Sequence, residues 1–192
     1  MGVVAVKRID NNYDSDKAVE NLIKYVIREK DSAEKVRYWG TRGLLKNVNY
    51  AIETIITMQR YLNKNKGRRM YHIVVSLPSC IKDEQVTYIL ADVLADYFGR
   101  RYQLGYGVHF NTDNYHIHIA MNSINYKTGK KWHKSKKEFA TWCDDLKDIS
   151  ESILREYNAI FKILRSSPSS LFLCTISGSV PKMSPSSSLL PS

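Results

Sequence analysis

Three of the five histidines lie within ten residues of one another, at a spacing that could create a metal site. His116 and His118 are two positions apart, so on a strand their side chains would share one face. His109 ends the preceding apolar run, and the turn-forming residues 111–114 would return it towards His116. Three neutral imidazoles that converge in this way can bind a borderline divalent metal ion and leave coordination positions open to a substrate.

The same strands also allow a site without a metal. A sheet that carries Phe110 and Tyr115 could instead stack nucleobases. His72 lies in a strand-like run on the same face as Ser76, and we interpret it as a core residue or as a residue that orients a ligand. We expect no role for His133, which lies in a run of lysines.

A tyrosine hydroxyl is a second candidate for chemistry. Tyr25 lies at the edge of the apolar stripe of a predicted helix, where a phenol can face the sheet and still reach solvent. Residue pattern alone favours a core role for Tyr25, and Tyr13 and Tyr38 are alternative candidates among the 13 tyrosines. Because a phenol has a pKa near 10, any tyrosine nucleophile needs a base or a nearby positive charge.

Alternating strand-like and helix-like patterns over residues 1–165 predict the elements that would position these side chains. Strands are expected over 3–9, 70–77, 101–110 and 115–124, with a short strand over 36–39 inside a basic loop over 31–43. Helices are expected over about 14–30, 44–62, 83–97 and 135–157. Strands that neighbour each other in sequence, mixed with helices, predict an α+β fold.

The composition predicts one basic domain and a tail. The chain has 192 residues and a formal charge of +10, which indicates a polyanionic partner, either nucleic acid or an acidic membrane surface. Residues 166–192 hold eleven serines and four of the five prolines. We interpret this segment as a non-globular tail, a linker or a truncation, and assign the folded domain to 1–165.

Basic residues interleaved with aromatic rings are typical of surfaces that bind single-stranded DNA. We therefore predict that three clusters contact DNA. Their residues are Arg37, Trp39 and Arg42; Lys64, Lys66, Arg68 and Arg69; and Lys130, Lys131, Trp132 and Lys134.

Cysteine usage and apolar patterning argue against several protein classes. Cys80, Cys143 and Cys174 are odd in number and far apart, which argues against a disulfide framework and a cysteine-ligated zinc. No run approaches the ~20 apolar residues that would span a bilayer. The N-terminus has no cleavage site of a secretory signal. We therefore expect a cytoplasmic protein without membrane insertion.

Three segments together resemble the motifs of a known family. His109-Phe-Asn111-Thr-Asp113-Asn114-Tyr-His116-Ile-His118-Ile-Ala-Met-Asn122 resembles the third motif of conjugative relaxases of the MobA/MobL and plasmid TraI type. These relaxases belong to the HUH endonucleases, which are named for a His-hydrophobe-His strand. Leu22-Ile-Lys-Tyr25-Val resembles their tyrosine motif, and Tyr71-His-Ile-Val-Val-Ser76 resembles the strand between the two motifs. The resemblance covers residues 1 to about 160.

The resemblance implies a fold and a set of site residues. The fold would be a mainly antiparallel sheet of about five strands with the histidine strand at its centre and helices on its faces. Tyr25 would be the nucleophile, and a divalent metal ion, manganese or else magnesium or zinc, would bind the three histidines of the third motif. Residues that orient these ligands would be Asn111, Asp113, His72 and Asn122. The family usually has an acidic residue at the position of Asn111, and this departure favours His109 as a neutral ligand over a strong base.

The resemblance also implies an activity. Such relaxases nick one DNA strand at a plasmid or transposon transfer origin, remain attached to the 5′ phosphate through tyrosine, and rejoin the strand after conjugative transfer in bacteria. Implied partners are single-stranded DNA, accessory proteins of the relaxosome and a coupling protein. A rolling-circle replication initiator shares this chemistry but commonly has its tyrosine after the histidines. A non-catalytic single-stranded DNA-binding module is the second alternative.

Overall fold

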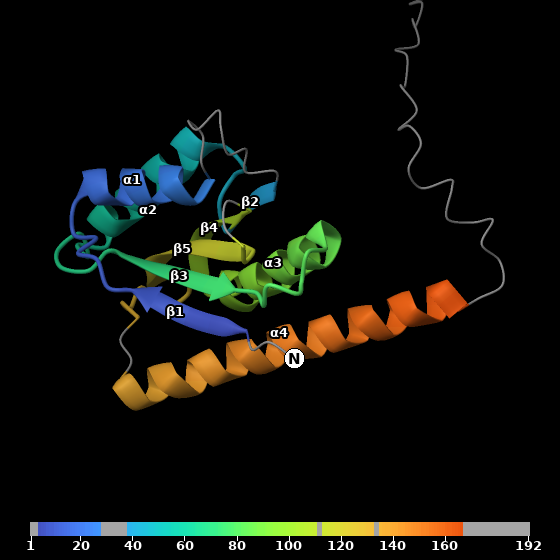
Figure 1. Ribbon diagram of the computed structural model, residues 1–192. Coiled ribbons are helices and arrows are strands. Elements are labelled where there is room, and N and C mark those ends of the chain that lie inside the picture. Colours follow the sequence, from blue (N-terminus) through green and yellow to red (C-terminus); the bar gives the residue numbers. More distant parts are fainter. Residues whose placement is uncertain (1–3, 28–37, 111–112, 133–134, 167–192) are drawn as a thin grey trace, which may run out of the picture. The chain divides into compact units, whose positions relative to one another are not determined.

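One antiparallel sheet contains all five strands that the structure describes. The computed structural model describes residues 4–27, 38–110, 113–132 and 135–166. Its strands run in the order β1-β3-β5-β4-β2 (Figure 1). They are β1 (Ala5–Ile9), β2 (Tyr38–Arg42), β3 (Met70–Ser76), β4 (Tyr102–His109) and β5 (His116–Asn125). The central place of β5 confirms the predicted α+β fold with the His-hydrophobe-His strand in the middle.

Three of the four described helices connect consecutive strands, and the fourth follows β5. They are α1 (Asp16–Ile27), α2 (Val48–Tyr61), α3 (Glu84–Gly99) and α4 (Lys136–Ser166). The chain divides into two compact units, residues 1–155 and 156–192, and the sheet lies in the first. α4 continues past the predicted end near residue 157, because good helix formers follow and no glycine or proline lies between residue 157 and Pro168. No helix in the described ranges is long and apolar enough to cross a membrane.

Side-chain caps fix where three of these helices begin. Ser15 Oγ accepts the Ala18 amide at 3.2 Å at the start of α1. Asp83 caps α3 by accepting two backbone amides, at 2.8 and 3.2 Å. Both starts agree with the sequence prediction. α2 begins four residues later than predicted, because the Asn47 side chain accepts the Tyr50 amide at 3.2 Å and caps the helix there.

The strand register places the histidines on one face of the sheet. His109 on β4 pairs with His116 on β5, so the predicted hairpin does return the first histidine to the second. On the other side of β5, His116 pairs with Ser76 and His118 pairs with Val74. Directly paired residues of antiparallel strands point to the same face. The three histidines therefore share a face with part of β3.

α1 packs directly on the histidine face. Its buried side chains include Val19, Leu22, Ile23 and Val26, which join a core cluster with residues of α2. The approach to the sheet is close at Gly105 of β4, where a Cβ would lie 3.5–3.6 Å from side chains of α1. α3 makes its contacts with β4, β2 and β5. Burial of each large apolar side chain contributes roughly 1.5–3 kcal/mol, so α1 is held firmly over β4 and β5.

The second strand differs from its prediction. Residues 31–43 were expected to form a loop with a short strand over 36–39, whereas β2 spans Tyr38–Arg42. Gly40 pairs with Tyr106, and a Cβ at Gly40 would lie 2.4 Å from the Tyr106 hydroxyl. Glycine is therefore required here for the close approach of a tyrosine ring. The residue pattern hides this strand because an internal glycine usually weakens one.

Candidate active site

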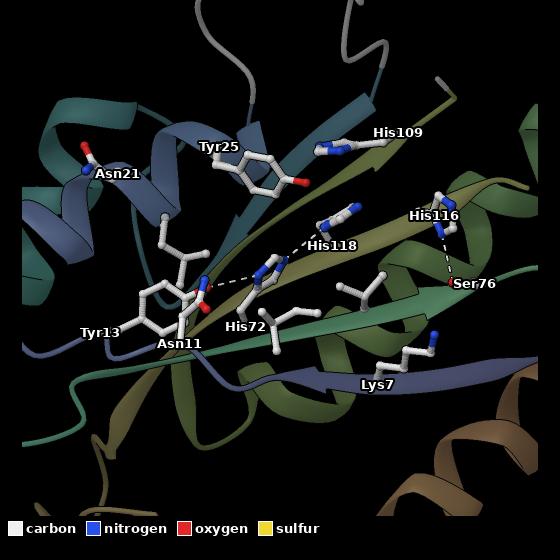
Figure 2. Close-up of a pocket in the computed structure, with 13 residues that line it drawn as sticks. Lys7, Asn11, Tyr13, Asn21, Tyr25, His72, Ser76, His109, His116 and His118 are labelled. Carbon is white, nitrogen blue, oxygen red and sulfur yellow. Dashed lines mark hydrogen bonds between the residues drawn. The ribbon is translucent and has the colours of Figure 1, made fainter. Parts of the chain in front are cut away.

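A cleft of about 590 Å³ opens between α1 and the histidine face of the sheet (Figure 2). Its lining comes from β1, β3, β4, β5, α1 and the segment that joins β1 to α1. The polar and charged lining residues are Lys7, Asn11, Tyr13, Asn21, Tyr25, His72, Ser76, His109, His116 and His118. The cleft therefore collects four histidines and two tyrosines from segments that are far apart in sequence.

The Tyr25 side chain projects from α1 and contacts the rings of three of these histidines. Its ring centroid lies 5.6 Å from those of His72 and His109 and 5.5 Å from that of His118. The side chain is 47% exposed, although its neighbours Leu22 and Val26 are buried. The phenol thus combines contact with the histidines and access to solvent, and this exposure contradicts the core role that the residue pattern alone favours.

The other two tyrosine candidates are placed less favourably for attack. Tyr13 is buried at 8% exposure, and its hydroxyl lies 3.2 Å from His72 Nδ1. Tyr38 neighbours Trp39 on β2, so the two side chains point to opposite faces. Trp39 packs against the α1–α2 core, which places Tyr38 on the face away from the histidines. Burial, followed by its hydrogen bond to Asp92, raises the pKa of Tyr38 to about 12.

Each of the three clustered histidines has one ring nitrogen held by the protein. His109 Nε2 lies 3.0 Å from the carbonyl oxygen of Val26, to which it donates. His116 Nδ1 lies 2.8 Å from Ser76 Oγ, and His118 Nδ1 lies 3.0 Å from His72 Nε2. Metal-ligating histidines almost always have such a partner, which fixes the ring and selects the nitrogen that ligates. These contacts suit a ligand role.

The donor set fits a divalent transition metal in chemical type. The ring centroids of His109 and His118 are 4.1 Å apart, and those of His116 and His118 are 6.1 Å apart. Burial, with a smaller effect of Lys7, lowers the pKa of His116 and favours the neutral form that a metal requires. Across the described ranges, no three histidine, cysteine or carboxylate side chains already have the arrangement of a metal site. The metal site stays a prediction.

His72 connects the histidine cluster to Tyr13. It is 5% exposed and lies between the Tyr13 hydroxyl and His118. This position agrees with a residue that orients a ligand. Burial, and then the neighbouring His109, lower the pKa of His72 from 6.5 to about 4.

The unfolding free energy of the metal-free protein should therefore decrease as the pH is lowered through the range in which His72 is protonated in the unfolded chain but not in the folded protein. Above about 6.5 the ring is neutral in both states; between about 6.5 and 4 the unfolded chain binds a proton that the folded state excludes. Unfolding free energy should decrease by up to about 3 kcal/mol as pH falls through this window. Urea denaturation at about pH 7 and about pH 4.5, in EDTA, measures this loss. A His72→Asn variant should lose clearly less over the same interval; an equal loss would contradict the assignment.

Several predicted DNA contacts are engaged inside the protein. Arg42 binds Asp92 at 3.1 Å and Asp96 at 2.5 Å, which ties β2 to α3. Arg69 is 3% exposed and binds Asp16 at 2.6 Å, and it holds the pKa of that carboxyl below its usual range. Both guanidiniums therefore have structural partners on distant elements, which the local charge pattern could not show.

Two residues of the third predicted DNA-binding cluster, Lys131 and Trp132, also make contacts within the protein. Lys131 donates to the backbone carbonyls of Lys66 and Arg68 at 2.5 and 2.9 Å, and burial lowers its pKa. Trp132 is 8% exposed and packs edge-on against Tyr71, with a centroid separation of 4.3 Å. Trp132 is thus a core residue, and the prediction that it stacks on DNA does not agree with its burial.

A Trp132→Ala variant tests this structural role. It should lower the unfolding free energy by about 3–5 kcal/mol, because it removes a large ring from the core. Single-stranded DNA affinity, measured below the unfolding temperature, should change less than about twofold. Lys130→Gln is the control, since the exposed Lys130 should leave the stability unchanged. Weaker DNA binding without loss of stability would restore the stacking role.

The remaining predicted residues have varied positions. Lys64, Lys66 and Lys130 are exposed, and Arg68 is partly exposed. Trp39 packs against the core with the Lys46 ammonium 5.1 Å from its ring. Arg37, Asn111 and Lys134 lie outside the described residues.

Two of the residues predicted to orient ligands make other contacts. The Asp113 carbonyl accepts a hydrogen bond from Lys82. Asn122 is fully buried and bonds to Gln59 and Gln103 at 2.9 and 3.0 Å. Its amide therefore joins β5 to α2 and β4, four residues beyond His118.

Sequence reasoning missed some of the lining. Lys7, Asn11 and Asn21 lie near the N-terminus, in segments whose pairing with the rest of the sheet is not local. Ser76 gave a usable signal, because strand alternation puts it on the face of His72. Its bond to His116, however, depends on the pairing of β3 with β5.

Comparison with known proteins adds independent information. The family model for MobA/VirD2-like relaxase nuclease domains matches residues 25–159. Two Staphylococcus aureus proteins, both called Protein rlx, are 28% and 26% identical to this chain over 142 and 145 residues. The matches cover 73% and 75% of this chain, but only 41% and 40% of the relatives. The chain therefore spans about two fifths of the length of these relatives.

A solved structure shares the fold. It comes from work on the molecular basis of vancomycin resistance transfer in Staphylococcus aureus. The two folds align with a TM-score of 0.57 over 81% of this chain and 94% of the other, at 14% identity. At this identity the similarity speaks for the architecture alone.

Proposed function

Because this chain belongs to the MobA/VirD2-like relaxase nuclease domains, we propose that it nicks one strand of DNA at a plasmid or transposon transfer origin. Tyr25 attacks the scissile phosphate and becomes linked to the 5′ end of the cut strand. The observation that supports this assignment best is the position of Tyr25, whose half-exposed ring lies within 5.6 Å of three histidine rings in one cleft.

The covalent step exchanges one phosphate ester for another. The bond from the Tyr25 oxygen to phosphorus forms as the bond from phosphorus to the 3′ oxygen breaks. The phenol loses its proton, and the 3′ oxygen takes one up to become a hydroxyl. Since the phosphotyrosyl ester conserves the energy of the broken ester bond, the 3′ hydroxyl can later attack the phosphorus of that ester and rejoin the strand.

The protein's own residues position the reacting groups. Packing of α1 on the sheet holds Tyr25 over the cleft. Ser76 fixes the ring of His116, and the pair His72 and Tyr13 fixes the ring of His118. Such support restricts each imidazole to one orientation and one tautomer.

We propose His109, His116 and His118 as the ligands of a divalent cation, with manganese as the first candidate and magnesium or zinc as alternatives. The bound ion would stabilise negative charge on the non-bridging phosphate oxygens. The exposed Lys64, Lys66 and Lys130 would contact the phosphate backbone of the DNA. In a bacterial cell, we expect the complete system to include relaxosome proteins and a coupling protein.

Mass spectrometry of a protein–DNA adduct tests the function directly. The chain is incubated with manganese and a pool of single-stranded oligonucleotides that carry a randomised centre, and covalent adducts are isolated and sequenced. We expect one tryptic peptide that contains Tyr25 and carries a 5′-linked nucleotide, together with a released strand that ends in a 3′ hydroxyl. Tight binding without an adduct would instead support the non-catalytic binding module. A 3′-linked adduct would overturn the proposed polarity.

A further inference from the structure

The cleft has a source of positive charge that its histidines do not provide. Lys7 is exposed and lines the cleft. The other described residues that line the cleft include no lysine, arginine, aspartate or glutamate. Phosphate groups bind through such cations, and a lining without carboxylates offers no competing partner. The lining is therefore complementary to a polyanion at Lys7.

Lys7 lies on the edge of the sheet, on the same face as the histidines. It pairs with Val74 of β3, and Val74 pairs with His118 of β5. Paired residues share a face, and neighbouring strands are about 4.8 Å apart. Lys7 is thus two strands, or roughly 10 Å along the sheet, from His118.

Tyr25 reaches the cleft from the opposite side. α1 packs on β4 and β5, whereas Lys7 lies on β1, beyond β3. Figure 2 shows Tyr25 and His109 above His118 and His72, and Lys7 below all of them. A phosphate bound at His116 and His118 would therefore lie between the tyrosine and the lysine.

We propose that Lys7 binds a backbone phosphate of the leaving strand, on the 5′ side of the scissile phosphate. The proposal rests on the proposed function, in which Tyr25 is the nucleophile. In-line displacement places the attacking and leaving oxygens on opposite sides of phosphorus. With Tyr25 on the α1 side, the 3′ oxygen leaves towards β1. Lys7 makes no covalent bond; it retains the strand whose 3′ hydroxyl must later rejoin.

The salt dependence of DNA binding tests the contact without any need for cleavage. A labelled single-stranded oligonucleotide is first selected for binding to the full chain carrying Tyr25→Phe. In this background Lys7→Gln should weaken binding two- to fivefold and reduce the slope of log K against log[salt] by about 0.7, the value for one phosphate contact on a single strand. Lys7→Arg should retain the slope. Lys147→Gln, an equal charge change on α4, should also leave it unchanged. An unchanged slope for Lys7→Gln overturns the contact.

Neutral phosphates then test the direction of the strand. A methylphosphonate is placed singly at each of the two phosphates on either side of the nick that the adduct experiment identifies. A methylphosphonate on the 5′ side should weaken DNA binding by the Tyr25→Phe protein two- to fivefold. It should not weaken DNA binding any further when Lys7→Gln is also present. Coupling to a 3′-side phosphate would overturn the direction. Absence of any covalent adduct would overturn the proposed function, whereas the salt slope decides the Lys7 contact independently.

Discussion

A Tyr25→Phe variant is expected to form no covalent adduct with single-stranded DNA and to nick at least about 1000-fold more slowly. The substitution removes the attacking oxygen but retains the ring that packs edge-on against His72, His109 and His118. DNA affinity and unfolding free energy should therefore change little, by about 0.5 kcal/mol or less. Denaturing gel electrophoresis of the adduct, with anisotropy for binding, separates loss of chemistry from loss of structure.

Two matched variants complete this test. Tyr38→Phe should nick at the normal rate, because Tyr38 lies on the face away from the histidines. Tyr13→Phe should nick at most about tenfold more slowly, since it loses one hydrogen bond to His72 but no reacting atom. If the adduct persists in Tyr25→Phe, or disappears only in Tyr38→Phe, the nucleophile has been assigned wrongly.

A His118→Ala variant has the second largest expected effect. It should lose high-affinity manganese binding and nick about 100- to 1000-fold more slowly, which corresponds to the several kcal/mol that a cation contributes to phosphate chemistry. The reason is its central position, stacked on His109 and bonded to His72. Electron paramagnetic resonance of bound manganese gives a readout that does not depend on catalysis.

The other histidines supply the comparisons for this experiment. His116→Ala should reproduce both losses, although it leaves the contact between His118 and His72 intact. His133→Ala should retain manganese binding and activity, because His133 lies outside the predicted ligand set. Full nicking by protein dialysed against EDTA would falsify the metal dependence, whatever the variants show.

The sequence determined the local part of the site. Strand alternation puts His116 and His118 on one face, and the turn over 111–114 predicts the hairpin that returns His109; the register confirms both. Helical spacing put Tyr25 at the edge of an apolar stripe, and the cap at Ser15 fixed the start of its helix. Each of these features depends on residues within about ten positions, where backbone geometry alone sets which side chains meet.

The sequence did not distinguish basic residues that are exposed from basic residues that are paired inside the protein. Arg42, Arg69 and Lys131 were predicted to contact DNA because basic residues are usually exposed. Their partners are Asp92, Asp96, Asp16 and backbone carbonyls, all on other elements or loops. A charge pattern cannot reveal an ion pair whose two members lie about fifty residues apart.

The tertiary structure alone decided how the site is assembled. Only one of the four strand pairs in the order β1-β3-β5-β4-β2 is a hairpin; the other three join strands that are distant in sequence. These pairings bring Ser76 to His116, His72 to His118 and Lys7 to the far side of the cleft from Tyr25. Non-local pairing is selected by burial of whole faces and not by any one segment. The sequence therefore determined which residues could do the chemistry, and the sheet order determined which of them meet.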